Sequence, residues 1–324
     1  MDVLSNGLGL TLVVFLPIVS ALFLVAIPKS QEGLIKIFAL GSSIVTFLLS
    51  AVLLFQFDFS NADKLQLGNK ISWIKSINAN YEIGIDGISL PLLVLSTFIS
   101  VLAIVYSLEH LPEPKSPKGF LALILVLETG MNGTFVALDL ILFFVFFEIV
   151  LLPMYFMIGI WGDKTVRSVA GFKNQIETRL YASIKFFVFT LFGSAFMLLG
   201  FLGLYYRGNK TFSIPELIEL GSTGAFTGTF ATLVFAVLFL GFAVKVPMWP
   251  LHTWLPDAHT AAPTVGSVLL AAILLKLGSY GFVRIAIPIL PEQAKAWAPA
   301  IAILSAIGII YGSLACLAQT DLKR

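Results

Sequence analysis

The sequence predicts an all-α membrane protein, a polytopic bundle of about nine transmembrane helices in which the seventh is discontinuous. Three observations support this class. Of the 324 residues, 58% are hydrophobic and 12% are charged, which is about half the charged share of a soluble domain. The apolar residues gather in runs long enough to cross a bilayer. Prolines interrupt one of these runs beside a lysine and two histidines.

This composition excludes several classes of protein. The mean hydropathy of +0.96 leaves too little polar surface to cover a soluble fold of this size. The net charge of +2 is too small for nucleic-acid binding. A single cysteine, Cys316, forms no internal disulfide and holds no iron–sulfur cluster. The sequence also lacks a nucleotide-binding loop, a haem motif and a catalytic triad, so we expect no redox chemistry within this chain.

Nine apolar runs are expected to form the helices, and the first lacks the preceding basic segment of a cleaved signal peptide. Their approximate bounds are 8–27, 34–57, 87–108, 118–136, 138–160, 181–206, 230–250, 263–288 and 298–318. The fourth and fifth runs are separated only around Asp139, which predicts a tight turn with this side chain either at the membrane interface or as a helix cap. Of the two long loops, 58–86 is placed on the outer surface and 207–229 contains a short helix near 215–220.

The distribution of Lys and Arg predicts the orientation. If the N-terminus lies outside, the inner segments carry more basic residues than the outer ones, and most of the difference comes from 161–180.

The seventh run ends in the sequence KVPMWPLHTWLP, which begins at Lys245. Each of its three prolines lacks a backbone donor and breaks a helix. One interpretation is a loop that leaves the membrane. The other is a discontinuous helix that lines a polar path, because non-helical backbone at membrane depth needs protein or water around it. Lys245, His252 and His259 beside the break favour the second interpretation.

Charged residues inside the predicted helices are candidate functional residues, because a charge at the bilayer centre costs roughly 2.5–3.5 kcal/mol. Glu148 lies within the fifth run and has no neutralising neighbour in sequence, so its partner must come from another helix. Lys245 and Lys276 lie in the seventh and eighth runs. For Glu148 and Lys245 the alternative is a static ion pair that fixes helix packing, whereas Lys276 lies too deep for its amine to reach the membrane surface easily.

Three further kinds of residue are weaker candidates. Glu128 precedes Gly130 and Gly133, which would permit close helix packing, and it either joins a polar path or pairs with a lysine. Lys185 is near the start of the sixth run and either joins the path or extends to the interface. His252 and His259 suit a proton relay and make a poor metal site without further ligands.

Several long motifs resemble the antiporter-like, proton-pumping membrane subunits of respiratory complex I, of the chain M or subunit 4 type. The resemblance runs from about residue 80 to the end. The motifs are YEIGIDGISLP at 81–91, ETGMNGTFVALD at 128–139, FEIVLLPMY at 147–155, FAVKVP at 242–247, PLHTWLPDAHT at 250–260 and APTVGSVLLAAILLKLGSYG at 262–281.

The resemblance implies roles for residues at matching positions. Glu148 pairs with Lys245, and Lys276 passes protons onward. Glu128, His252 and His259 support the hydrated path. Many members carry an acid where Ala261 stands here, so any role of that acid is absent.

The resemblance also implies an organisation and a setting. We expect helices 1–3 in 1–117, an antiporter-like half-repeat of helices 4–8 in 118–288, and the start of a truncated second half-repeat in 289–324. NADH, FMN, iron–sulfur clusters and quinone are expected in partner subunits, with no cofactor or metal in this chain. The partners are the lipid bilayer and other membrane subunits, including neighbouring antiporter-like ones.

The expected location is a bacterial plasma membrane, with an organellar inner or thylakoid membrane as alternatives.

Two other functions stay open. One is a subunit of a multisubunit sodium/proton antiporter or a membrane-bound hydrogenase. The other is a structural membrane scaffold with static ion pairs.

Overall fold

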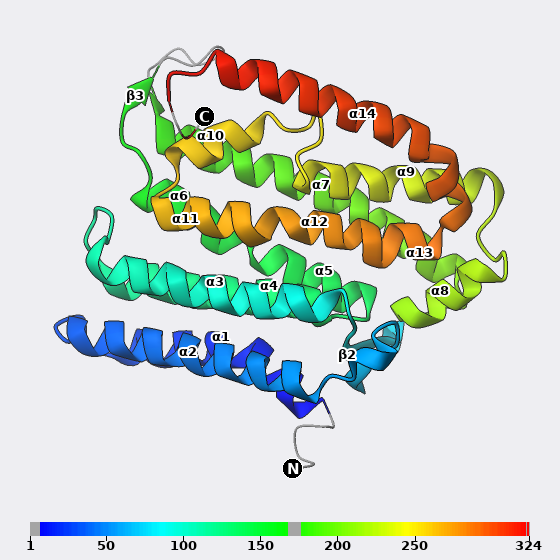
Figure 1. Ribbon diagram of the computed structural model, residues 1–324, viewed down its shortest axis with the longest axis horizontal. Coiled ribbons are helices and arrows are strands. Elements are labelled where there is room, and N and C mark those ends of the chain that lie inside the picture. Colours follow the sequence, from blue (N-terminus) through cyan, green and yellow to red (C-terminus); the bar gives the residue numbers. More distant parts are fainter. Residues whose placement is uncertain (1–6, 168–175, 322, 324) are drawn as a thin grey trace. The chain divides into compact units, whose positions relative to one another are not determined.

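The computed structural model describes residues 7–167, 176–321 and 323 (Figure 1). Within these residues, nine helices are long and apolar enough to cross a membrane, which confirms the predicted fold class. Their bounds are Leu8–Ala26, Glu32–Gln56, Ser89–Glu109, Pro117–Val136, Leu140–Trp161, Thr178–Arg207, Gly228–Lys245, Thr264–Ile289 and Pro291–Leu317.

Two predicted edges are wrong by more than a turn, and proline explains both. The seventh span ends at Lys245 rather than at 250, because Pro247 cannot continue the helix. The ninth span begins at Pro291 rather than at 298, because the fixed backbone angle of proline suits the first position of a helix. The charged residues Glu292 and Lys295 lie in the first turns of this helix.

The chain divides into two compact units. Unit 1 contains Met1–Met157 and Ala271–Ile273, and unit 2 contains Ile158–Leu270 and Leu274–Arg324. The two units are defined by how densely their residues contact one another. The three regions expected from the sequence are defined by the repeats of the family, so they stay a prediction. Each unit is described by itself.

Unit 1 is built around α4 (Pro117–Val136). This helix packs against α1 (Leu8–Ala26), α2 (Glu32–Gln56) and α3 (Ser89–Glu109), and it contacts α5 (Leu140–Ile149) as well. Its most apolar stretch is 83% buried, against 33–44% for the other three long helices. Polar side chains on α4 therefore lie inside protein rather than against lipid.

The predicted outer loop 58–86 folds into a hairpin that the sequence analysis did not anticipate. Strands β1 (Gln66–Ile74) and β2 (Ala79–Ile85) pair antiparallel, accompanied by short 3-10 turns η1 (Phe59–Asn61) and η2 (Lys75–Ile77). The backbone N–H of Leu138 donates to the Glu82 carbonyl at 2.8 Å, and Ile83 bridges to Ala137. The turn between α4 and α5 is thus held by the hairpin.

Asp139 confirms its predicted capping role. Its carboxyl accepts the N–H groups of Ile141 at 2.9 Å and Leu142 at 3.2 Å, which have no partner within the helix, and that of Asn80 in β2 at 2.9 Å. Burial raises the pKa of the Asp139 carboxyl, and these backbone donors oppose the rise. One side chain therefore fixes the start of α5 to the hairpin.

The fifth span is interrupted. It consists of α5 and α6 (Leu151–Trp161), which meet at Val150. Pro153 lacks the N–H that the Ile149 carbonyl would receive, and proline is the usual cause of such a kink. Glu148 lies in the last turn before this break.

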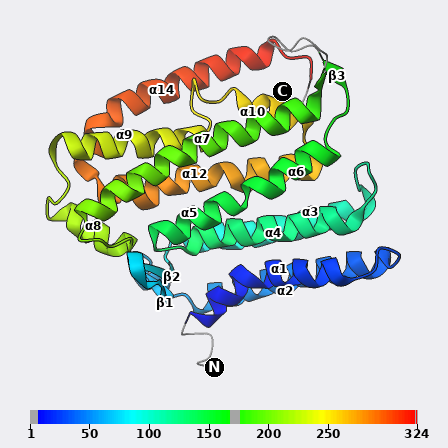
Figure 2. The same cartoon turned by 180° about the vertical axis from the view of Figure 1, so that it is seen from behind.

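Unit 2 contains the long helix α7 (Thr178–Arg207), which packs along α9 (Gly228–Lys245) and against α10 (Trp254–Ala261) (Figure 2). The short α8 (Ile214–Ser222) confirms the helix predicted near 215–220. Strands β3 (Val166–Arg167) and β4 (Ile176–Glu177) precede α7. Residues 168–175 of the basic segment 161–180, with Lys173, are outside the described residues.

The eighth span is irregular. It runs through α11 (Thr264–Leu269), the π-helical η3 (Leu270–Leu274), α12 (Leu275–Gly281), the π-helical η4 (Phe282–Ala286) and α13 (Ile287–Ile289), and α14 (Pro291–Leu317) follows.

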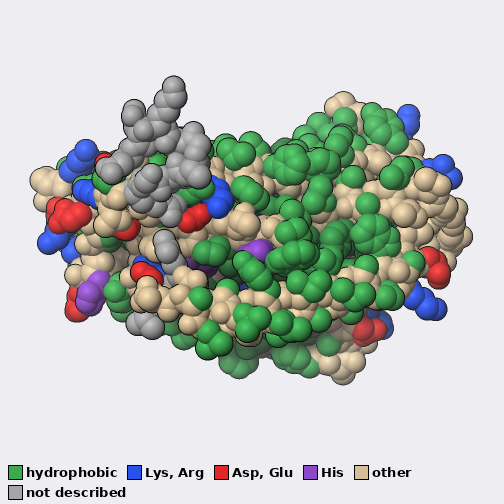
Figure 3. All heavy atoms as spheres, turned by 90° about the horizontal axis from the view of Figure 1, so that it is seen from above, with side chains coloured by type: hydrophobic (Ala, Val, Ile, Leu, Met, Phe, Trp, Pro, Cys, Tyr) green, Lys and Arg blue, Asp and Glu red, His purple; other side chains and the backbone are tan. Residues whose placement is uncertain are grey.

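The face drawn in Figure 3 carries hydrophobic side chains across its middle and charged side chains at both ends. This distribution suits a hydrocarbon layer between two aqueous surfaces.

Candidate functional site

The residues singled out from the sequence fall into two sets. Glu128 and Glu148 belong to unit 1, whereas the lysines and histidines belong to unit 2. The acidic set and the basic set are each described within their own unit, and the predicted pairing of Glu148 with Lys245 stays a prediction.

The acidic set depends on close packing of α4 against α5. A Cβ atom at Gly133 would clash with the Phe146 ring, and one at Gly130 would lie 2.7 Å from Cγ1 of Val150 and 3.1 Å from the Phe146 carbonyl. The close approach predicted from these glycines is therefore confirmed. It places α4 directly against the turn of α5 that carries the half-buried Glu148.

Glu128 is fully buried in α4, with 0% of the side chain exposed. The Ser43 hydroxyl of α2 faces its carboxyl group. Neither carboxyl oxygen has a hydrogen-bond partner among the described residues. A lysine hydrogen-bonded to Glu128, one of the two alternatives considered from the sequence, is not seen in this part of the chain.

The basic set is organised by the break after α9. Lys245 is the last residue of this helix, and its side chain is 4% exposed. The chain then folds back through 246–253 and begins α10, where the buried Trp254 donates from Nε1 to the Val244 carbonyl at 3.0 Å. This bond satisfies one of the carbonyls freed at the helix end. The predicted discontinuous seventh helix is confirmed.

Lys276 lies on α12, which approaches the end of α9 closely. A Cβ atom at Gly278 would be 3.0 Å from Cβ of Lys245 and 3.1 Å from the Phe242 carbonyl. Two π-helical segments flank α12, and π-bulges occur frequently at functional sites. The Lys276 side chain is exposed. Because a charge at this depth needs polar surroundings, the exposed face of Lys276 requires water or protein.

Adding a side chain at Gly278 tests this approach. We expect Gly278→Val to lower the apparent Tm of the full-length protein, because the added atoms overpack the contact between α12 and α9 at a cost of about 1–3 kcal/mol. Gly266→Ala in the same span is the matched control, since its Cβ meets neighbours only at 3.5 Å. Equal apparent Tm values of both variants in detergent would contradict the close contact between α12 and α9.

Lys185 forms an ion pair that the sequence did not reveal. Its Nζ lies 2.8 Å from Oδ2 of Asp257 in α10, and the side chains are only 19% and 20% exposed. The pair joins α7 to the second part of the broken helix. Asp257 was not singled out, because it lies among the prolines and histidines of 250–260 and its burial depends on how α10 folds back.

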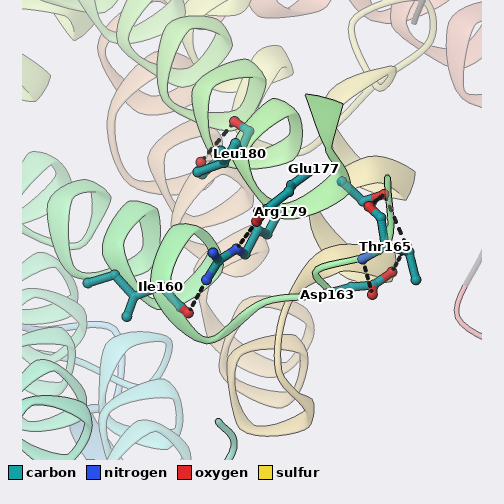
Figure 4. A network of polar contacts seen from close by, with 8 residues as sticks. Ile160, Asp163, Thr165, Glu177, Arg179 and Leu180 are labelled. Atoms are coloured by element: carbon teal, nitrogen blue, oxygen red, sulfur yellow. Dashed lines mark hydrogen bonds and ion pairs between the residues drawn. The ribbon is translucent and has the colours of Figure 1, made fainter. Parts of the chain in front are cut away.

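A second network of polar contacts lies at the start of α7 (Figure 4). Arg179 donates to the Ile160 carbonyl and to Glu177, both at 2.6 Å. The Asp163 carboxyl accepts the Thr165 N–H at 2.9 Å, and the Asp163 N–H donates to the Ala261 carbonyl at 2.8 Å. The end of α6, the start of α7 and the end of α10 are thereby tied together.

We expect the pair to be coupled. Lys185→Met and Asp257→Asn should each lower the stability of unit 2 by about 1–3 kcal/mol, because each leaves a partly buried group unsatisfied. The double variant should be more stable than the sum of the two losses predicts. The stability losses are measured as changes in the apparent Tm of the purified full-length protein in detergent. Strictly additive losses would mean that the two side chains contribute independently.

The two histidines occupy different settings. His252 lies in the turn before α10, packs edge-on against Tyr311 of α14 at 5.3 Å between ring centroids, and borders a cavity of about 330 Å³. Its Nδ1 has no hydrogen-bond partner among the described residues. His259 lies within α10, and its carbonyl accepts the Ser267 hydroxyl at 3.1 Å. His252 is therefore the histidine that borders this cavity.

Comparison with known proteins identifies the family. The profile of the NADH:quinone oxidoreductase/Mrp antiporter transmembrane family matches residues 137–324, and that of the amino terminus of NADH-ubiquinone oxidoreductase chain 4 matches residues 11–134. The chain belongs to the NADH:quinone oxidoreductase/Mrp antiporter family. The resemblance stated from the sequence motifs is confirmed.

Relatives in this family are similar over nearly the whole chain. NADH-quinone oxidoreductase subunit M of Rhodobacter capsulatus is 41% identical over 97% of this chain and 60% of its own length. NADH-ubiquinone oxidoreductase chain 4 of Arabidopsis thaliana is 41% identical over 95% of this chain and 58% of its own. The chain thus spans about three fifths of the length of these relatives.

Solved structures agree with the family. A chain of respiratory complex I from Thermus thermophilus with bound NADH is 28% identical and has a TM-score of 0.80, over 97% of this chain and 60% of that one. A chain of the archaeal membrane-bound sulfane sulfur reductase shares the fold, with a TM-score of 0.78 at 21% identity over 98% and 61%.

The described residues contain no group of three or more His, Cys, Asp or Glu that would hold a metal ion. The polar side chains within the described membrane spans include acids, lysines, arginines, amides and hydroxyl groups.

Proposed function

We propose that this chain is a proton-translocating membrane subunit of an NADH:quinone oxidoreductase. The complex that it forms with its partner subunits is an enzyme of the translocase class. The observation that supports this most is the break at Lys245. A lysine with 4% exposure ends one half of a discontinuous helix, and α12 with Lys276 packs against it. Such broken helices line ion paths in transporters.

In the proposed mechanism, Glu148 and Lys245 act as the coupling pair. When the two charges are close, each stabilises the other, and Lys245 retains its proton at Nζ. When they separate, Lys245 loses that stabilisation and releases the proton toward Lys276. Glu128, His252, His259 and Lys185 support the hydrated path, and Lys185 does so together with Asp257.

The partners follow from the same proposal. Electron transfer from NADH through FMN and iron–sulfur clusters to quinone takes place in other subunits, and this chain contacts neighbouring antiporter-like membrane subunits. The chain is integral to the membrane. We propose a bacterial plasma membrane with the N-terminus on the outer side, and the relatives from bacteria and from Arabidopsis thaliana keep an organellar membrane as an alternative.

The complex that contains the full-length protein, reconstituted in vesicles, tests the function. We expect NADH oxidation to acidify one side of the membrane without any requirement for sodium. The family profile also includes Mrp antiporters, which makes a sodium/proton antiporter subunit the second candidate. Sodium-dependent proton exchange without NADH would favour that candidate and overturn the first, and neighbouring genes for NADH dehydrogenase subunits would support the first.

A further inference from the structure

The break after α9 changes the hydrogen bonding of the buried turn that ends in Lys245. In a continuous helix, the carbonyls of Ala243 and Val244 would accept the N–H groups that lie four residues later. Pro247 has no N–H for the Ala243 carbonyl, which accepts the N–H of Met248 instead, at 2.9 Å. The Val244 carbonyl, directly before Lys245 in the chain, therefore loses its usual donor.

A side chain from the second part of the broken helix replaces that donor. The indole N–H of Trp254 in α10 donates to the Val244 carbonyl at 3.0 Å. Val244 and Trp254 are each 1% exposed, so this carbonyl does not reach bulk solvent. A buried carbonyl that loses its donor carries the full cost of its desolvation. The indole N–H is thus the contact that lets the chain break at this point.

Trp254 is itself held by α7, which packs against α10. Its ring lies 5.4 Å from the ring of Phe186 between centroids. One turn further along α10, Asp257 pairs with Lys185, the neighbour of Phe186 in the chain. The ring of Trp254 is therefore fixed on α7, while its N–H reaches the turn that ends in Lys245.

We propose that Trp254 is a positioning residue for Lys245. Its N–H keeps the last turn of α9 against α10, and the Lys245 side chain therefore leaves the backbone at a fixed place beside α12. Without this donor, the turn must shift until the Val244 carbonyl finds another one, and misplaced reacting groups lose rate steeply. The effect on transport rests on the proposed function, whereas the contact itself does not.

Two substitutions separate the hydrogen bond from the packing of the ring. Trp254→Phe keeps an aromatic ring against Phe186 and loses the N–H. Trp254→Gln loses the ring and keeps a neutral N–H donor on a side chain of similar reach. In vesicles with the complex that contains the full-length protein, we expect Trp254→Phe to lower proton translocation per assembled complex by about tenfold, the equivalent of one lost hydrogen bond. Trp254→Gln should have the lower apparent Tm of the two variants and the higher translocation rate.

Trp297→Phe is the matched control. The Trp297 ring packs on Phe235 and Phe239, earlier in α9, at 5.6 Å between centroids, so this variant should translocate protons like the wild type. A wild-type rate per assembled complex in Trp254→Phe would overturn the proposal. Rates that follow the Tm values of the two Trp254 variants would also overturn it, because a tryptophan that only stabilises the fold predicts that order.

Failure of the proposed function has a different signature. A wild-type complex that translocates no protons when it oxidises NADH would remove the function, and the contact is then tested by hydrogen exchange of the indole N–H groups in D₂O, followed by NMR. We expect the Trp254 signal, identified by its loss in Trp254→Phe, to exchange at least about tenfold more slowly than that of the half-buried Trp297. Equal exchange rates would overturn the contact and the positioning role with it.

Discussion

Glu148→Gln should abolish NADH-driven proton translocation while the complex that contains the full-length protein assembles normally. Gln has the same shape as Glu and stays neutral, so the substitution removes the negative charge of the proposed coupling pair without leaving a cavity. Rate or stoichiometry should fall by about tenfold or more, since a charge interaction of 1.4 kcal/mol already corresponds to a factor of ten. Acidification of vesicles per NADH oxidised measures the effect.

The local structure explains why this position should be sensitive. Glu148 lies in the last turn of α5, directly before the break caused by Pro153. The Gly130 contact with Val150 fixes that turn against α4, and Asp139 fixes the other end of α5 to the hairpin. The helix turn that carries Glu148 is therefore fixed by contacts at both ends of α5.

Two variants serve as controls for Glu148→Gln. Glu148→Asp keeps the charge and shortens the side chain by one methylene, so it should retain part of the activity. Glu82→Gln removes a carboxylate that pairs with Lys70 at 3.2 Å outside the spans, so translocation should continue. Wild-type proton stoichiometry in Glu148→Gln would show that Glu148 has no coupling role.

The elements that could be predicted from the sequence are those that local chemistry determines. Long apolar runs fix the spans, because hydrocarbon permits only helices with satisfied backbones. Prolines fix the break after Lys245, and paired glycines fix the close packing of α4 and α5. The capping role of Asp139 also follows from its position between two helices, since a carboxylate at that point accepts free N–H groups.

The elements that were missed depend on contacts between distant segments. The hairpin β1–β2 is polar and mixed in composition, and its register is set partly by the α4–α5 turn, which lies more than 50 residues away. Asp257 becomes a functional candidate only when α10 folds back and brings it to Lys185. No pattern within one segment contains these pairings.

Lys245→Met should abolish proton translocation and leave assembly intact, which separates a proton carrier from a structural scaffold. Met fills a similar volume and has a flexible side chain, so packing near Gly278 is preserved while the amine is lost. At the C-terminal end of α9, the lysine charge also interacts favourably with the helix dipole, an effect of about 0.3–1 kcal/mol. This loss is small, so we expect the amount of assembled complex on native gels to stay near that of the wild type.

Lys118→Met is the comparison variant for Lys245→Met. Lys118 donates to the Ile27 carbonyl at 2.7 Å at the start of α4, so its amine ties α4 to the end of α1 within unit 1. Its loss should reduce thermal stability and leave the proton stoichiometry unchanged. A scaffold held by static pairs predicts the same outcome for both lysines, namely less complex of unchanged stoichiometry. Proton carriage by Lys245 predicts the opposite for that residue, because removing the group that binds the proton leaves the helices packed and the path interrupted.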